Sequence, residues 1–176
     1  MAATRRAAVV VGIDESLAGL AALRYAVGEA RRRECGLRAV RVWQVGAFRA
    51  YDAGLGEAAA AQAVAEDAAA MVRRAFESAM GGVPRDIEIQ AGVVEGAVVP
   101  ALIAQITSAD DVLVVGTSRR RGLGRLSAVD RHCVRIAPCP VVVVPAPELA
   151  RANGRRALAR EVQREARRYA DAGGVV

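Results

Sequence analysis

The chain of 176 residues contains no lysine, so all 25 of its basic residues are arginine. Aromatic residues make up only 3% of the chain, and histidine occurs once. With so few aromatic side chains, the core has to be built from Val, Leu, Ile and Ala. An alanine-rich, lysine-free composition is also typical of a GC-rich genome, so the arginine bias alone does not indicate a binding function.

The chain has three cysteines, Cys35, Cys133 and Cys139, and no two of them have the spacing of metal ligands. An odd and small number excludes a disulfide framework, and we expect reduced, buried side chains in a cytoplasmic protein. Long hydrophobic runs are also lacking, because the apolar run at residues 7–13 is followed directly by Asp14. We therefore expect neither a signal peptide nor a membrane span.

The formal net charge of +6 is unevenly distributed along the chain. Residues 119–125 carry four Arg and no acidic residue, and residues 147–176 carry seven Arg and four acidic residues. The remainder, with 14 Arg against 15 acidic residues, is close to neutral. Two short segments therefore hold the whole positive excess.

Short apolar runs alternate with amphipathic segments over most of the chain. This alternation predicts an α/β fold with a five-stranded parallel sheet and helices on both faces. Of the Rossmann-like, doubly wound topologies, we expect the strand order 3-2-1-4-5. We expect Ser16 to cap the first helix. The predicted strands are 7–13, 37–44, 86–91, 110–116 and 141–144, and the predicted helices are 17–33, 57–80, 95–107 and 126–136.

The last 30 residues predict a separate element. Leu158, Val162 and Tyr169 fall on one narrow helical stripe, and arginines occupy the rest of the surface. We therefore divide the chain into a domain of residues 1–146 and a basic amphipathic C-terminal helix of residues 147–176. The helix is expected to pack against its own domain or a protein partner; an anionic membrane or nucleic acid is the alternative.

Ligands of doubly wound sheets bind outside the carboxyl ends of the strands, where the strand order reverses. In this sequence two loops flank that point, residues 12–16 and residues 116–127. The first offers Asp14, and the second offers glycines and four Arg just before a helix. Glycines let backbone N–H groups approach an anion, and a helix N-terminus adds positive charge. The pattern predicts a phosphate cradle, with a solvated basic loop as the alternative; neither a P-loop nor a dinucleotide fingerprint is present.

Four segments carry a family resemblance: VVVGIDES at residues 9–16, LRAVRVW at 37–43, DVLVVGTS at 111–118 and APCPVVVVP at 137–145. In this order and spacing, residues 6–146 resemble the universal stress protein (UspA-like) family. The resemblance implies a dimeric regulator in stress response that acts through ligand-gated interaction. It implies no catalysis, although weak ATP hydrolysis stays open.

Members of that family that bind ATP carry G-x-x-G-x9-G-[ST] after the fourth strand and an Asp after the first strand. Gly116 and Asp14 match, but Arg119 replaces the second Gly. Ser127 and Ala128 stand at the terminal positions, and the intervening loop is two residues short. A Cβ at residue 119 hinders close backbone approach, whereas arginines can supply charge-assisted contacts instead.

The resemblance implies ATP or AMP as ligand, with a smaller anion equally consistent and no metal required. The implied nucleotide contacts are Gly12, Ile13, Asp14, Val42, Gly116, Thr117, Arg119, Gly122, Gly124, Arg125, Ser127 and Ala128. Dimerisation is expected through the last strand, at Val141, Val142, Val143 and Val144, unless the C-terminal helix covers this edge.

Two alternatives remain in different functional classes. The chain could be an interaction module of the same family that binds no nucleotide and contacts a protein through its altered loop and basic tail. Nucleic-acid binding through the Arg segments is disfavoured, because Tyr169 is their one aromatic residue and a single ring offers little base stacking. His132 and the acidic residues form no set of nucleophile and base that would indicate an enzyme.

Overall fold

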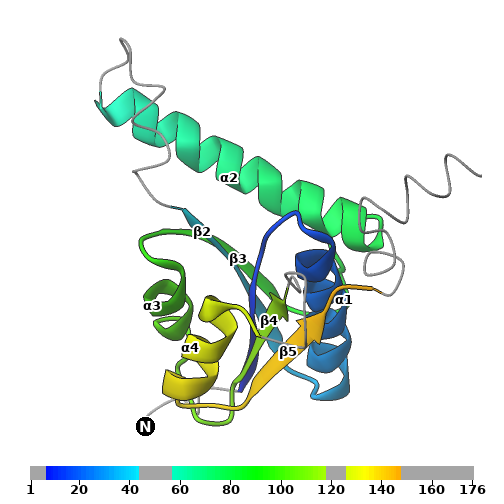
Figure 1. Cartoon of the computed structure of the whole chain (residues 1–176). Coiled ribbons are helices and arrows are strands. Elements are labelled where there is room, and N and C mark those ends of the chain that lie inside the picture. Colours follow the sequence, from blue (N-terminus) through cyan, green and yellow to red (C-terminus); the bar gives the residue numbers. More distant parts are fainter. Residues whose placement is uncertain (1–6, 44–56, 118–125, 148–176) are drawn as a thin grey trace, which may run out of the picture.

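The computed structural model describes residues 7–43, 57–117 and 126–147, without the side chains of residues 57–65 and 68. Five parallel strands form one sheet in the order β3-β2-β1-β4-β5, which confirms the predicted topology (Figure 1). The strands are β1 (Ala8–Gly12), β2 (Gly36–Trp43), β3 (Ile89–Glu95), β4 (Val112–Thr117) and β5 (Val141–Pro145).

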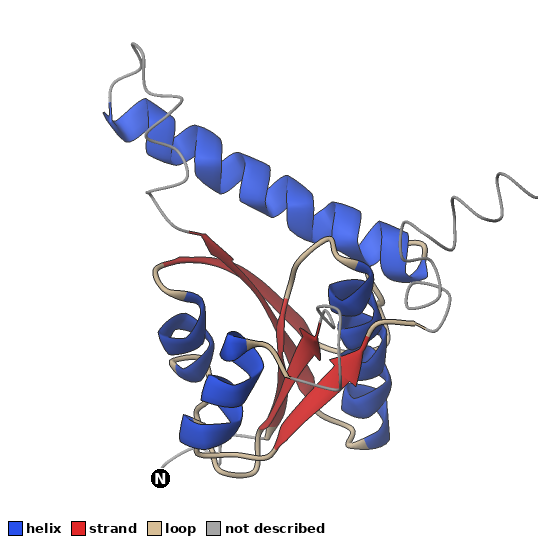
Figure 2. Ribbon diagram, viewed as in Figure 1, coloured by secondary structure: helices blue, strands red, loops and turns tan. Residues whose placement is uncertain are grey.

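Helices cover both faces of the sheet, as Figure 2 shows. α1 (Leu17–Arg32) and α2 (Glu57–Met80) lie on one face, whereas α3 (Val98–Ile103) and α4 (Ala128–Ile136) lie on the other. Alternate residues of β1 point to the two layers, because Val9 and Val11 pack with the α1 and α2 side and Val10 packs with the α3 and α4 side. β1 is therefore apolar throughout, as expected for a central strand of a parallel sheet buried on both faces.

The β3 and α3 boundaries differ from the sequence prediction. β3 begins at Ile89, not at residue 86, because it pairs in register with β2 from Leu37 onward. The strand continues to Glu95 and ends before Gly96, whose φ of 141° suits glycine. α3 spans only Val98–Ile103, whereas the prediction extended the helix to residue 107.

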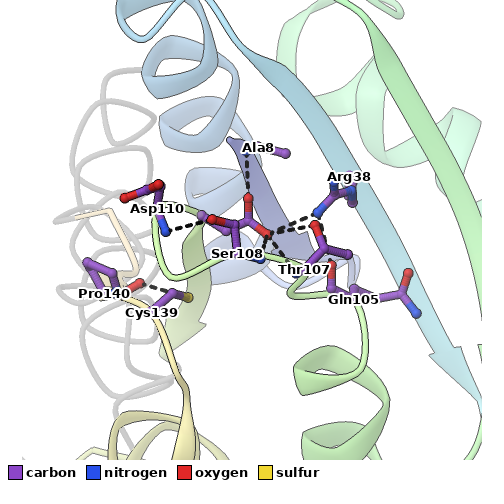
Figure 3. A network of polar contacts seen from close by, with 9 residues as sticks. Ala8, Arg38, Gln105, Thr107, Ser108, Asp110, Cys139 and Pro140 are labelled. Atoms are coloured by element: carbon purple, nitrogen blue, oxygen red, sulfur yellow. Dashed lines mark hydrogen bonds and ion pairs between the residues drawn. The ribbon is translucent and has the colours of Figure 1, made fainter. Parts of the chain in front are cut away.

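The helix stops early because Asp111 captures the backbone that follows it. The Asp111 carboxylate accepts hydrogen bonds from the backbone N–H groups of Thr107 and Ser108, at 2.8 and 3.1 Å. It also accepts from the N–H of Ala8, at 2.8 Å, and from Arg38 Nη1, at 3.1 Å (Figure 3). This fully buried carboxylate therefore joins β1, β2 and the segment before β4.

Burial of Asp111 would by itself raise its pKa. The amides of Thr107, Ala8 and Ser108 and the Arg38 guanidinium outweigh that effect and hold the pKa of Asp111 below its ordinary value. Asp111 thus has a structural role. Asp110 is exposed, and its own N–H donates to the Ser108 hydroxyl at 3.1 Å.

The three cysteines are free thiols in the interior or partly buried. Cys133 and Cys139 belong to the core layer between the sheet and the α3–α4 side, and Cys35 is half-buried against the other layer. Burial raises the pKa of each thiol. The expectation of buried cysteines is confirmed for Cys133 and Cys139, whereas Cys35 is only half-buried. A raised pKa makes each thiol a poor nucleophile. The predicted C-terminal helix lies, except for residue 147, outside the described residues.

Candidate functional site

Asp14 stands at the carboxyl end of β1, on the turn into α1. Its Oδ1 accepts a hydrogen bond from the Ser16 N–H at 2.8 Å, and the Ser16 hydroxyl accepts one from the Gly19 N–H at 3.0 Å. Ser16 is therefore the N-cap of α1, as the sequence predicted. The carboxylate lies directly on the first helical turn, since a Cβ at Gly19 would come within 2.0 Å of Asp14 Oδ1.

The carboxyl end of β4 meets the same helical turn. A Cβ at Gly116 would lie 2.5 Å from the backbone oxygen of Ala18 and 2.8 Å from the nitrogen of Gly19. Only glycine permits this approach of β4 to α1. The next residue, Thr117, is buried, and its hydroxyl has no hydrogen-bond partner among the described residues. A buried hydroxyl without a partner is uncommon and is a candidate ligand contact.

The loop after β1 is also tied to β2. The Ile13 N–H donates to the carbonyl of Val40 at 2.8 Å, and Arg41 Nη1 donates to the carbonyl of Ile13 at 3.1 Å. Val42, two residues beyond Val40, is half-buried and packs with the layer on the α3–α4 side. The backbone around Ile13 is therefore fixed from the β2 side of the crevice.

α4 is the crossover helix between the parallel strands β4 and β5, so its N-terminus faces the carboxyl edge of the sheet. Ser127 is its N-cap: the Ser127 hydroxyl accepts from the Asp130 N–H at 3.1 Å, and the Ser127 N–H donates to Asp130 Oδ2 at 2.8 Å. Arg131 Nη1 also donates to the carbonyl of Leu126, at 2.8 Å. The backbone N–H groups of Ser127 and Asp130 are therefore both bonded to side chains within this helix start.

Eight of the twelve predicted nucleotide contacts lie in the described part of the structure: six are at or directly after the carboxyl ends of β1, β2 and β4, and two are at the start of α4. They are Gly12, Ile13, Asp14, Val42, Gly116, Thr117, Ser127 and Ala128. The other four, Arg119, Gly122, Gly124 and Arg125, lie outside the described residues.

Sequence reasoning missed two residues of this region. Arg41 was not singled out, because an arginine within a strand gives no local sign that it reaches the loop after another strand. Asp130 was missed although a signal existed: Ser127 and Asp130 have the S-x-x-acid spacing of a helix-capping pair.

The larger of two described surface recesses, about 630 Å³, lies at the opposite, amino-terminal edge of β1 and β2. Its wall includes the exposed ion pair of Arg31 and Asp86, at 2.6 Å, and the half-buried Cys35. We place the candidate site at the carboxyl edge instead, because doubly wound sheets bind ligands where the strand order reverses. In this sheet that point lies between β1, which continues to β2, and β4.

Among the described residues, no helix is both long and apolar enough to span a membrane. Nor do the described His, Cys, Asp and Glu side chains form a group of three or more that could hold a metal ion.

The fold defines a Rossmann-like α/β domain of the doubly wound class. Residues 6–145 match the universal stress protein family, and the chain belongs to that family. No curated protein matches the sequence significantly.

Solved structures agree with this assignment. One similar structure is the crystal structure of a universal stress protein in complex with cAMP. The two sequences are 26% identical, the TM-score is 0.57, and the match covers 80% of this chain and 98% of that chain. A universal stress protein from Archaeoglobus fulgidus is 19% identical, with a TM-score of 0.50, over 79% of this chain and 98% of that chain, and it supports the fold.

Proposed function

We propose that this protein is a regulator in stress response that binds an adenine nucleotide in the crevice between β1 and β4. The observation that carries the proposal is the Asp14 carboxylate. It is exposed at the point where the strand order reverses, and Oδ1 is held by the Ser16 amide. Oδ2 has no hydrogen-bond partner among the described residues, so it is available to accept hydrogen bonds from ribose hydroxyl groups.

Two further observations support a nucleotide. The Thr117 hydroxyl, buried at the end of β4, has no hydrogen-bond partner among the described residues, so it is free to donate a hydrogen bond to a ligand oxygen. The relative that is 26% identical is described in complex with cAMP. Contacts from Arg119, Gly122, Gly124 and Arg125 to phosphate remain predictions from the sequence.

In this proposal the bound nucleotide changes how the protein contacts its partners, and no chemical step is required. The protein acts in the cytoplasm as a homodimer formed through β5. Support for the dimer comes from the position of β5 at one edge of the described sheet, where Val141–Val144 are only partly buried. An edge strand exposes backbone groups that a second chain can pair with.

The second candidate function is a protein-interaction module that binds no nucleotide. The observation that favours it is the closed N-terminus of α4, where the Ser127 N–H is already bonded to Asp130. A phosphate group approaching this helix finds one fewer free backbone donor. The two candidates differ in whether the crevice holds any adenine compound at all.

The experiment that separates them uses the purified full chain. After denaturation, released small molecules are identified by absorbance at 260 nm and by mass, and the ligand-free chain is tested for thermal stabilisation by adenosine, AMP and ATP. The proposal predicts released adenine nucleotide or stabilisation of the folded state by at least one compound. An empty protein without stabilisation at millimolar concentrations would instead support the interaction module.

A further inference from the structure

Arg41 takes the place of a backbone donor at the end of the β1–β2 ladder. The ladder runs in register to Gly12 and Val40, and the Ile13 N–H continues it by donating to the Val40 carbonyl at 2.8 Å. In a regular parallel pair, the Ile13 carbonyl would then accept from a backbone N–H of β2. No described backbone N–H donates to this carbonyl; Arg41 Nη1 does so instead, at 3.1 Å.

Both partners of this hydrogen bond have fixed positions. The Ile13 side chain is 4% exposed and belongs to the core layer beside α1 and α2. Arg41 points to the same face of β2 as Ala39, because Val40 between them faces the α3–α4 side. Arg41 is also half-buried. The guanidinium therefore reaches the Ile13 carbonyl from a paired strand, and its direction is set by the sheet.

The direction of the Ile13 carbonyl decides the direction of the Asp14 N–H. The peptide bond between the two residues is trans and planar, so its C=O and N–H groups point in opposite directions. Val40 and Arg41 of β2 hold the N–H and the C=O of Ile13, so this carbonyl points toward β2. The Asp14 N–H therefore points away from β2 and toward β4, the other neighbour of β1 (Figure 1).

The Asp14 N–H has no hydrogen-bond partner among the described residues. The β1–β4 ladder ends before it, at Val11 and Val114, and the end of β4 lies against α1 at Gly116. Asp14 also offers Oδ2, so one residue presents a donor and an acceptor at the crevice. A ribose hydroxyl group both donates and accepts hydrogen bonds, which suits this pair.

We infer that Arg41 is a positioning residue of the nucleotide site: it orients the Ile13–Asp14 peptide so that the Asp14 N–H donates to the bound ligand. This inference rests on the proposed nucleotide site between β1 and β4. Arg41 acts through the peptide and contacts no ligand atom. Because the phosphate takes no part in this contact, adenosine and AMP depend on Arg41 to the same extent.

The first test compares two ligands by isothermal titration calorimetry on the full chain. Arg41→Ala should weaken the binding of adenosine and of AMP by the same factor, about three- to tenfold, which corresponds to one lost neutral hydrogen bond. Arg41→Lys keeps a donor on a long side chain and should restore most of this affinity. Arg85→Ala removes an exposed arginine that precedes β3, at the amino-terminal edge of the sheet, and should bind both ligands like the unmodified chain.

The second test observes the peptide itself by nuclear magnetic resonance. In Arg41→Ala without ligand, the carbonyl ¹³C shift of Ile13 should change, because this carbonyl loses its hydrogen bond. On addition of AMP, the amide proton of Asp14 should move to higher frequency in the unmodified chain and should move less in Arg41→Ala. Arg41→Met, which keeps an apolar stem but no donor, repeats both tests if Arg41→Ala does not fold. An Asp14 amide that AMP does not shift would overturn the inference.

The outcomes separate the inference from the proposed function. If both ligands bind the unmodified chain and Arg41→Ala equally well, the nucleotide site stands and the role of Arg41 is refuted. A loss confined to AMP would mean that Arg41 attracts the phosphate, and an equal loss in Arg85→Ala would reduce the effect to net charge; either result refutes the positioning role. If neither ligand binds the unmodified chain, the proposed function and the inference both fail.

Discussion

Replacing Asp111 by alanine tests whether one buried carboxylate holds the amino ends of the strands together. The change removes an acceptor from the N–H groups of Ala8, Thr107 and Ser108 at 2.8 to 3.1 Å. It also leaves the Arg38 guanidinium, 19% exposed, without its carboxylate partner. These donors lie on three separate segments: Ala8 is on β1, Arg38 is on β2, and the other two follow α3. The substitution should therefore destabilise the whole sheet.

The magnitude follows from the contacts that are lost. A hydrogen bond to a charged group contributes about 1.5–3 kcal/mol, and several bonds on one carboxylate are not additive. Removing one partner of a buried ion pair typically costs about 3–5 kcal/mol. For a domain of this size, each kcal/mol shifts the melting temperature by about 2–4 °C. Asp111→Ala should therefore lower the melting temperature by about 6–20 °C.

The assay is thermal unfolding followed by circular dichroism, with chemical denaturation as a second measure of the free energy of unfolding. Asp110→Ala is the matched control, because this neighbouring carboxylate is exposed. Its effect should stay within about 0.5 kcal/mol. If the two variants unfold at the same temperature, the reasoning about the Asp111 hydrogen bonds is wrong.

Three further predictions concern stability and assembly. Because the pKa of Asp111 is lowered in the folded state, its contribution to the free energy of unfolding is complete above the ordinary carboxyl pKa, about 4, and is lost as the pH falls through the lower folded-state pKa. Between pH 5 and pH 2 the unmodified chain should therefore lose more unfolding free energy than Asp111→Asn, and equal losses would contradict this. Gly116→Ala would place a Cβ 2.5 Å from the backbone oxygen of Ala18 and should lower the free energy of urea unfolding by about 1–3 kcal/mol. Gly92→Ala, with no atom within 4 Å of its Cβ, should be less destabilising, and a larger loss in Gly92→Ala would refute the close approach of β4 to α1. If β5 pairs two chains, light scattering should give a mass of twice 18.4 kDa, and a single-chain mass at micromolar concentration would exclude that dimer.

The topology was predictable because its signals are local and strong. The valines of β1 and the apolar run of β4 leave no polar face, so these strands have to be buried on both faces. The helices between successive strands are typical of the crossover connections of a parallel sheet. The boundaries of β3 and α3 were not predictable. They depend on pairing with β2 and on Asp111, which captures the Thr107 and Ser108 amides from outside the helix.

The candidate site was predictable in part, for a related reason. Asp14 follows a buried strand directly, so its place at the carboxyl edge can be deduced from the strand alone. Arg41 reaches the Ile13 carbonyl from the neighbouring strand β2, and no spacing in the sequence encodes that contact. The spacing of Ser127 and Asp130 predicts a helix-capping pair, but the sequence does not tell where this helix begins relative to the crevice.

The proposed function requires that an adenine nucleotide binds between β1 and β4 with Asp14 as a direct contact. The most direct measurement is calorimetric titration of AMP into the ligand-free chain, Asp14→Ala and the exposed-carboxylate control Asp110→Ala. Loss of charge-assisted hydrogen bonds to ribose predicts affinity about tenfold or more lower in Asp14→Ala and unchanged affinity in the control. Equal AMP affinity in all three proteins, or no binding to the unmodified chain, would contradict the account.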